Sequence, residues 1–97
     1  VVVLKGAGTL IACPQGLLAV CSNGHPAMAG AGFGDVLAGL IGALLAQGLP
    51  AYAAACLAVW LHARAGEQLA GHGRGMAASD LLPVIREQLE AFSPCLV

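Results

Sequence analysis

The feature that most limits the fold of this chain is the stretch from Val36 to Leu61, which contains no charged residue. Gln47-Gly48 and Pro50 interrupt it, and each of the two remaining segments is too short to cross the hydrocarbon core of a bilayer comfortably. Their alanine and glycine residues also weaken membrane insertion relative to leucine. We therefore expect two helices buried within a folded protein, and no membrane partner.

The composition narrows the class of protein further. Of the 97 residues 59% are hydrophobic and only 9% are charged, so we expect part of the chain to pack against a segment outside it. The net charge is −1 and the four basic residues are scattered, which disfavours nucleic-acid binding. No C-x-x-C pair occurs, so neither a metal cluster nor a disulfide framework is indicated. Four cysteines are expected to be reduced and buried: Cys13, Cys21, Cys56 and Cys95.

The pattern along the chain predicts strands first and helices after. Short runs of β-branched and apolar residues between turn residues predict strands over Val1–Lys5, Thr9–Cys13 and Leu17–Cys21. Apolar periodicity predicts helices over Asp35–Gln47, Ala51–Leu69 and Ser79–Phe92, the last with Ser79 as its N-cap. The first helix is apolar around its whole circumference and is expected to be buried on nearly all sides. The expected fold class is α/β, with short strands at a sheet edge followed by three helices that cover it.

A glycine-dense loop, Gly30 to Gly34, runs directly into the first predicted helix. Glycines let backbone N–H groups approach an anion, and the first helical turn adds unpaired donors and partial positive charge. Asp35 stands at the mouth of this phosphate cradle, where it could accept a proton from a hydroxyl that attacks phosphorus. The alternative interpretation is a plain linker in which Asp35 is only a helix N-cap. Neither G-x-x-x-x-G-K-[ST] nor G-x-G-x-x-G is present.

A second candidate segment is Lys5-Gly6-Ala7-Gly8-Thr9, where a buried strand ends in a lysine and a glycine turn. A lone lysine at a strand end is usually surface decoration. Beside two glycines, whose N–H groups are open to a ligand, it becomes a plausible phosphate or adenosine contact.

The histidines carry weaker indications. His25 is interpreted as a loop residue in preference to a ligand, and His62 as a helix residue at the boundary between buried and exposed surface. His72 and Arg74 could line a ligand or simply be solvated. Arg64 and Glu67 are expected to pair weakly on the helix surface.

Taken in order, several segments resemble the C-terminal part of the ADP-dependent NAD(P)H-hydrate dehydratase family of the ribokinase-like superfamily. The similarity spans nearly the whole chain, through V-V-L-K-G-A-G-T (2–9), G-H-P-A-M-A (24–29), G-F-G-D-V-L-A-G (32–39), A-Q-G-L (46–49) and G-M-A-A-S-D-L-L (75–82). This resemblance implies that residues 1–97 are the C-terminal portion of one ribokinase-like domain whose upstream part is missing, and that the piece alone is inactive.

The resemblance also implies a function. The enzyme would be a lyase of metabolite repair that dehydrates (6S)-NAD(P)H hydrate back to NAD(P)H with ADP as co-substrate and Mg²⁺, releasing AMP and phosphate. It would be a cytoplasmic homo-oligomer. Asp35 would be catalytic and face the substrate's hydrated nicotinamide ring. The adenine nucleotide would be bound by Lys5, Gly6, Ala7, Gly8, Thr9, Gly32, Phe33 and Gly34.

The chain departs from the family pattern at four positions. His25 stands where asparagine is common, while Ala27 and Gly30 replace a usual glycine and a usual small polar residue. Phe33 fills a position that often holds threonine, serine or methionine, and it offers no side-chain donor to phosphate. The cradle would therefore depend on backbone N–H groups.

The sequence leaves two other functions open. One is a vitamin-precursor or sugar kinase of the same superfamily, which shares the G-x-G-D element. The other is a non-enzymatic apolar packing module or membrane-associated helical hairpin without a ligand.

Overall fold

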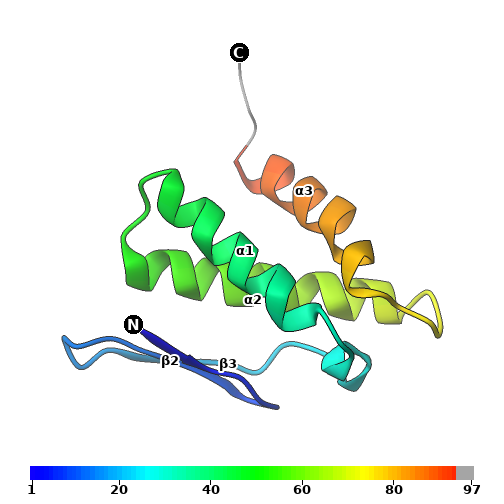
Figure 1. Cartoon of the computed structure of the whole chain (residues 1–97), viewed down its shortest axis with the longest axis horizontal. Coiled ribbons are helices and arrows are strands. Elements are labelled where there is room, and N and C mark those ends of the chain that lie inside the picture. Colours follow the sequence, from blue (N-terminus) through cyan, green and yellow to red (C-terminus); the bar gives the residue numbers. More distant parts are fainter. Residues whose placement is uncertain (94–97) are drawn as a thin grey trace.

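The computed structural model describes residues 1–93 and confirms a mixed α/β fold with strands first and helices after (Figure 1). Cys95, one of the four cysteines expected to be reduced and buried, lies outside the described residues. The strands are β1 (Val2–Leu4), β2 (Thr9–Ala12) and β3 (Leu18–Cys21). The helices are α1 (Phe33–Ala46), α2 (Ala51–Ala70) and α3 (Leu81–Phe92), and two short 3₁₀ turns are η1 (Pro26–Ala29) and η2 (Ala78–Asp80).

The sheet has the order β1-β2-β3 with both pairs antiparallel. Ile11, in the central strand, pairs with Val3 on one side and Ala19 on the other. Because side chains alternate between the faces of a strand, Thr9 and Ile11 are buried toward the helices while Val20 stays exposed. The sheet therefore covers the helices with one face only.

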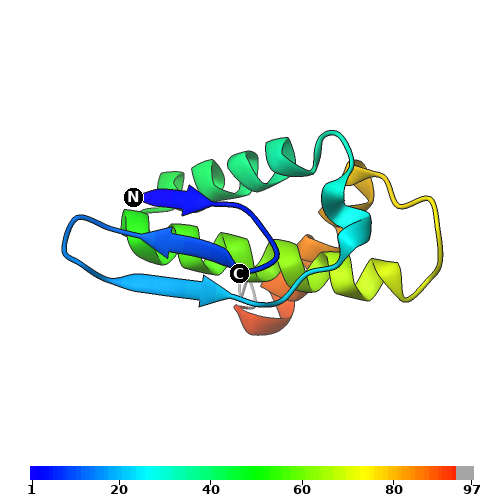
Figure 2. The same ribbon diagram turned by 90° about the horizontal axis from the view of Figure 1, so that it is seen from below.

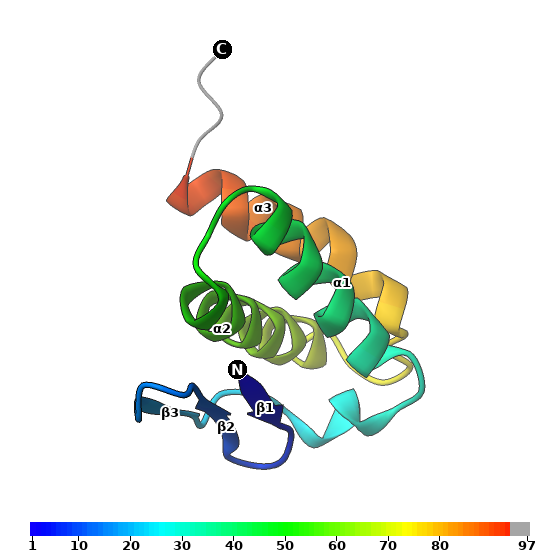
Figure 3. The same ribbon diagram turned by 60° about the vertical axis from the view of Figure 1, so that its left-hand side comes forward.

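Helix α2 is the central element, with the sheet on one side and α1 and α3 on others (Figures 2 and 3). Its alanines allow close approach, and Ala54, Ala55 and Ala58 pack with Ile11 in a cluster that joins the sheet to α1 and α2. A second cluster joins the start of α1, the end of α2 and α3. It contains Phe33, Ala65, Leu81, Val84 and Ile85.

Helix α1 differs from expectation in two respects. It begins two residues earlier, because Gly32 takes a left-handed backbone (φ +88°) as the N-cap. It is also buried along one stripe only, formed by Phe33, Leu37 and Leu44. The expectation of burial on nearly all sides is wrong for the described residues, since α1 rests on α2 and no described element covers its glycine-rich and alanine-rich outer face.

Two smaller expectations are also corrected. Ser79 is not the N-cap of α3, because it lies inside η2; instead Asp80 Oδ2 accepts a 2.8 Å hydrogen bond from the Ala77 amide. The three described cysteines are half-buried instead of buried; Cys21 and Cys56 pack against the edge of the first cluster, and Cys13 follows β2. No helix within residues 1–93 combines the length and hydropathy that crossing a bilayer requires.

Candidate active site

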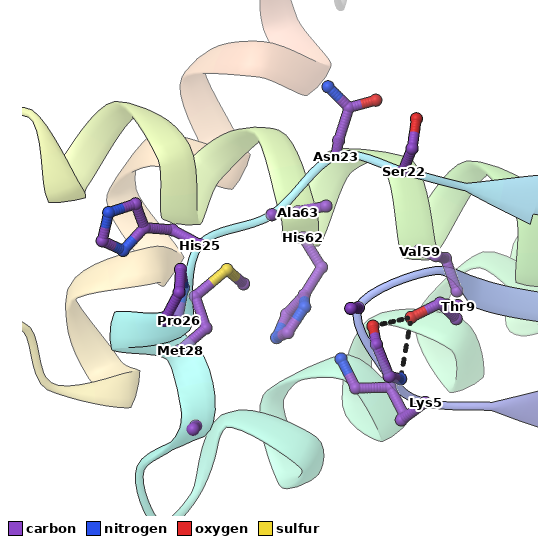
Figure 4. Close-up of a pocket in the computed structure, with 14 residues that line it drawn as sticks. Lys5, Thr9, Ser22, Asn23, His25, Pro26, Met28, Val59, His62 and Ala63 are labelled. Atoms are coloured by element: carbon purple, nitrogen blue, oxygen red, sulfur yellow. Dashed lines mark hydrogen bonds between the residues drawn. The ribbon is translucent and has the colours of Figure 1, made fainter.

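The two segments that the sequence singled out lie at the same end of the molecule, where the β1–β2 turn, η1 and the start of α1 meet (Figures 1 and 2). An open pocket of about 600 Å³ lies here (Figure 4). Among the predicted nucleotide contacts, Lys5, Gly6, Ala7 and Thr9 line it, whereas Gly8 and residues 32–35 do not. The rest of its wall comes from Ser22, Asn23, Gly24, His25, Pro26, Met28, Ala29, Val59, His62 and Ala63.

The turn between β1 and β2 is closed by its own threonine. The buried Thr9 hydroxyl donates to the Gly6 carbonyl at 3.2 Å, and the Gly6 amide donates back to Thr9 Oγ1 at 3.4 Å (Figure 4). These two bonds use the hydroxyl inside the protein, so Thr9 shapes the turn. Lys5 and Ala7 remain exposed at the pocket and carry the parts of this segment that a ligand can reach.

The start of α1 offers unpaired backbone donors. Its first internal bond runs from the Val36 amide to the Gly32 carbonyl at 3.1 Å, so the amides of Phe33, Gly34 and Asp35 precede the helical ladder. No hydrogen bond to another described residue uses them. A Cβ placed on Gly34 would meet no described atom within 4 Å. The backbone here is therefore open to an anion, as the cradle interpretation requires.

Asp35 is the third residue of α1, and Gly32 holds the N-cap position instead. The interpretation of Asp35 as a plain N-cap is thus wrong. Its side chain is exposed, and no described residue forms a hydrogen bond or ion pair with it. The carboxylate stands free beside the three open amides.

His62 lies deeper than expected. It is 1% exposed instead of lying at a boundary, and its Nε2 is 2.9 Å from the carbonyl oxygen of Phe33. Because a carbonyl only accepts, Nε2 must carry the hydrogen. Burial lowers the pKa of His62 and the charge of Lys5 lowers it further, although the bond to Phe33 opposes both effects. His62 thereby connects α2 to the first residue of α1.

The loop before η1 is held from α2. The Gly24 amide donates to Glu67 Oε1 at 2.8 Å, and this bond, followed by the Asn23 side chain, holds the pKa of Glu67 below its ordinary value. Arg64 does not form the expected pair with Glu67; its guanidinium lies over the Trp60 ring, 5.4 Å from the centroid. Arg64 still helps to lower the pKa of Glu67, but it contributes less than Gly24 and Asn23 do.

The remaining histidines and Arg74 have local roles or none that the structure assigns. His25 is a loop residue, as expected, and its Nδ1 accepts from the Ala27 amide at 3.0 Å to cap η1. His72 and Arg74 are exposed in the loop after α2, away from the pocket lining.

The sequence interpretation assigned no site role to Asn23 and His62, which line the pocket, or to Glu67, which holds the loop that forms one wall. Their partners are distant in the chain, 29 residues from Phe33 to His62 and 43 from Gly24 to Glu67. The one usable signal was His62 itself, since a histidine in an alanine-rich apolar helix must find a hydrogen-bond partner when it is buried.

Known proteins share this sequence and fold. The family model described as NAD(P)H-hydrate dehydratase matches residues 1–87. The bifunctional NAD(P)H-hydrate repair enzyme Nnr of Vibrio cholerae is 56% identical over 91 residues, which cover 92% of this chain and 18% of that protein. The ADP-dependent (S)-NAD(P)H-hydrate dehydratase of Neisseria meningitidis is 46% identical over 88 residues, covering 88% of this chain and 30% of that protein.

A solved structure agrees with the sequence comparisons. The ADP/ATP-dependent NAD(P)H-hydrate dehydratase of Bacillus subtilis, co-crystallised with ATP and Mg²⁺, superposes with a TM-score of 0.85 at 29% identity. The superposition covers 93% of this chain and 33% of that one, so this chain spans about a third of its structural relative. The fold is the expected ribokinase-like α/β fold, and the chain belongs to the NAD(P)H-hydrate dehydratase family.

Proposed function

We propose that this chain forms the phosphate-handling part of an enzyme that restores hydrated NADH or NADPH at the expense of ADP, releasing AMP and phosphate. One observation carries the proposal: the unpaired amides of Phe33, Gly34 and Asp35 open beside the free Asp35 carboxylate. A relative that is 46% identical is an ADP-dependent (S)-NAD(P)H-hydrate dehydratase, which supports the same substrate class.

The nucleotide would lie across the end of the molecule where the two segments meet. The Lys5 turn borders the pocket and would contact the adenine nucleotide, with the ammonium supplying charge. The amides at the start of α1 would hold the phosphoryl group that is transferred. His62 lines the pocket and bonds to Phe33, so the first turn of α1 is joined to the pocket wall without lining it.

The chemistry follows from the charge at this turn. The Asp35 carboxylate would take the proton of the ring hydroxyl while the hydroxyl oxygen attacks the β-phosphorus of ADP. The bond from this phosphorus to the bridging oxygen breaks and AMP leaves. The open amides stabilise the negative charge on the phosphoryl oxygens in the transition state of the transfer. The phosphorylated ring then loses phosphate with the C–O bonding electrons and a proton from the adjacent carbon, which restores the ring double bond.

We propose that Mg²⁺ binds together with the nucleotide. Within the described part of the chain, no three His, Cys, Asp or Glu side chains gather into a metal cage. Mg²⁺ is commonly held by substrate phosphates with few protein ligands, so the ADP phosphates would bring it. When bound it would neutralise phosphate charge.

The test is recovery of NADH absorbance from NADH hydrate by the full-length protein with ADP and Mg²⁺. The proposal expects recovery that requires ADP and yields one AMP per NADH. A small-molecule kinase of the same fold would instead phosphorylate an alcohol without restoring NADH. Absence of recovery from hydrate that a Neisseria-type dehydratase does convert would contradict the proposal.

A further inference from the structure

Two polar side chains are buried in the described part of the chain, Thr9 and His62. The Thr9 hydroxyl is used inside its own turn with Gly6. His62 instead reaches out of α2 to another helix, and its ring projects into the space between Met28 and Lys5 (Figure 4). Burying an imidazole costs desolvation free energy that an apolar side chain of similar size would avoid. The hydrogen bond to the Phe33 carbonyl offsets this cost and is the structural role of His62.

We propose that His62 is a positioning residue for phosphoryl transfer, whose Nε2–H holds the Phe33 carbonyl and thereby aims the Gly34 amide at the transferred phosphate. The inference rests on the proposed function. In this inference a side chain of α2, His62, orients a hydrogen-bond donor of α1, the Gly34 amide.

The argument depends on the geometry of one peptide unit. The carbonyl of Phe33 and the N–H of Gly34 belong to the same planar, trans peptide, so they point in opposite directions. A hydrogen bond that fixes the carbonyl toward His62 therefore fixes the N–H outward from the beginning of α1. Gly34 has no side chain, and open space lies where its Cβ would be, so a ligand can approach this N–H closely.

The Phe33 side chain alone does not supply this control. Its ring is buried with Leu81 and Ile85, which anchors the position of the residue. The Phe33–Gly34 peptide lies in the first turn of α1, where the Gly34 amide has no hydrogen-bond partner among the described residues. The bond from His62 adds a side-chain restraint to that of the helix, and it ties this peptide to α2, which packs against α1.

The charge state of His62 suits a donor of this kind. Burial and the neighbouring Lys5 lower its pKa, which favours the neutral ring with its hydrogen on Nε2. A neutral ring donates to Phe33 without adding a cation that would draw phosphate away from the helix terminus.

The test compares two amide variants of the full-length protein. In His62→Gln the side-chain nitrogen can occupy the place of Nε2 and keep the bond, whereas in His62→Asn the amide is too short to reach Phe33. Dissociation constants for ADP and AMP are measured by calorimetry. AMP lacks the transferred phosphate and serves as the internal control for general damage to the pocket. We expect His62→Asn to weaken ADP binding about ten-fold, the equivalent of one net hydrogen bond, with AMP binding unchanged. His62→Gln should keep ADP affinity within about two-fold.

The outcomes separate this inference from the proposed function. If wild-type protein fails to restore NADH, the proposed function is wrong and the inference goes with it. If wild type is active but both variants bind ADP equally well, or if His62→Asn weakens AMP and ADP by the same factor, only the inference is overturned. Should His62→Asn not fold, His62→Gln decides alone, and a Gln variant that loses ADP binding or does not fold contradicts the assignment.

Discussion

The amide of Gly24 donates a 2.8 Å hydrogen bond to Oε1 of Glu67, a residue 43 positions further along the chain. The bond ties the loop at Ser22–His25, one wall of the pocket, to helix α2. The Asn23 side chain, like this bond, lowers the pKa of Glu67. The shape of the pocket on this side therefore depends on an ionised carboxylate.

The attachment predicts a pH dependence of stability. The hydrogen bond from Gly24, and after it the one from Asn23, holds the pKa of Glu67 below its ordinary value of 4.5. Because the folded pKa is the lower one, the stabilisation is fully present above pH 4.5 and is lost as pH falls through the folded pKa. The Tm advantage of wild type over Glu67→Gln should be constant from about pH 7 to about pH 5 and shrink below that range. An advantage that is unchanged at about pH 2 contradicts this role.

Gly34→Ala separates binding from stability. The new Cβ would meet no described atom within 4 Å, and alanine favours a helix over glycine by up to about 1 kcal/mol. We predict an unfolding midpoint equal to or above that of wild type, together with a loss of ADP affinity of about ten-fold, because the methyl group obstructs the approach of phosphate. Gly39→Ala on the same helix is the matched control, since its Cβ also meets nothing and its position lies away from the turn. Equal ADP affinity in the two variants would count against a phosphate at Gly34.

Gly66→Ala should destabilise the protein through Met28. A Cβ at Gly66 would overlap the Met28 sulfur and would lie 2.6 Å from its Cε and 2.7 Å from its Cγ. Because Cγ is among the overlapped atoms, the whole Met28 side chain must leave its place against the cluster that joins α1, α2 and α3; overpacking of this kind costs about 1–3 kcal/mol, against a helix-propensity gain of about 1 kcal/mol. Chemical denaturation should show a lower free energy of unfolding for Gly66→Ala. In a Met28→Ala background the same change should cost nothing, and an unchanged cost there would refute the contact as the cause.

Asp35→Asn removes the proposed base and keeps its shape. Loss of a general base lowers kcat by about 10²-fold to 10⁴-fold, whereas the backbone amides that bind phosphate remain. We predict that the rate of NADH recovery falls by at least about 10²-fold, while the ADP dissociation constant is unchanged. Turnover and calorimetry on the same preparation check both halves of the prediction. Retained turnover would remove Asp35 from the reaction.

The sequence was informative where local chemistry decides the structure. The three strands and three helices were predicted to within two residues at every end, because turn residues such as Pro14-Gln15-Gly16 and Gly48-Leu49-Pro50 separate them. The start of α1 was misplaced because Asp35 resembles an N-cap, whereas the left-handed backbone at Gly32 ends the loop first. Ser79 failed as a cap for a similar reason, since Asp80 satisfies the Ala77 amide.

The sequence was less informative where distant segments meet. The openness of the amides at Phe33–Asp35 could be anticipated, because a glycine loop before a helix leaves them unpaired by construction. The bonds of His62 and Glu67 could not, since they depend on how α2 passes beneath α1 and the loop before η1. The burial of α1 was overestimated because composition shows which side chains are apolar but not which face finds a neighbour.

The central claim is that the first turn of α1 holds the phosphate that is transferred. The most direct measurement is the position of ADP in a crystal structure of the full-length protein. The account predicts a β-phosphate oxygen at hydrogen-bond distance from the Gly34 amide nitrogen, about 2.7–3.2 Å, with the Asp35 carboxylate adjacent. Phosphates bound elsewhere, or the amides of Phe33–Asp35 engaged by other protein groups, would contradict it.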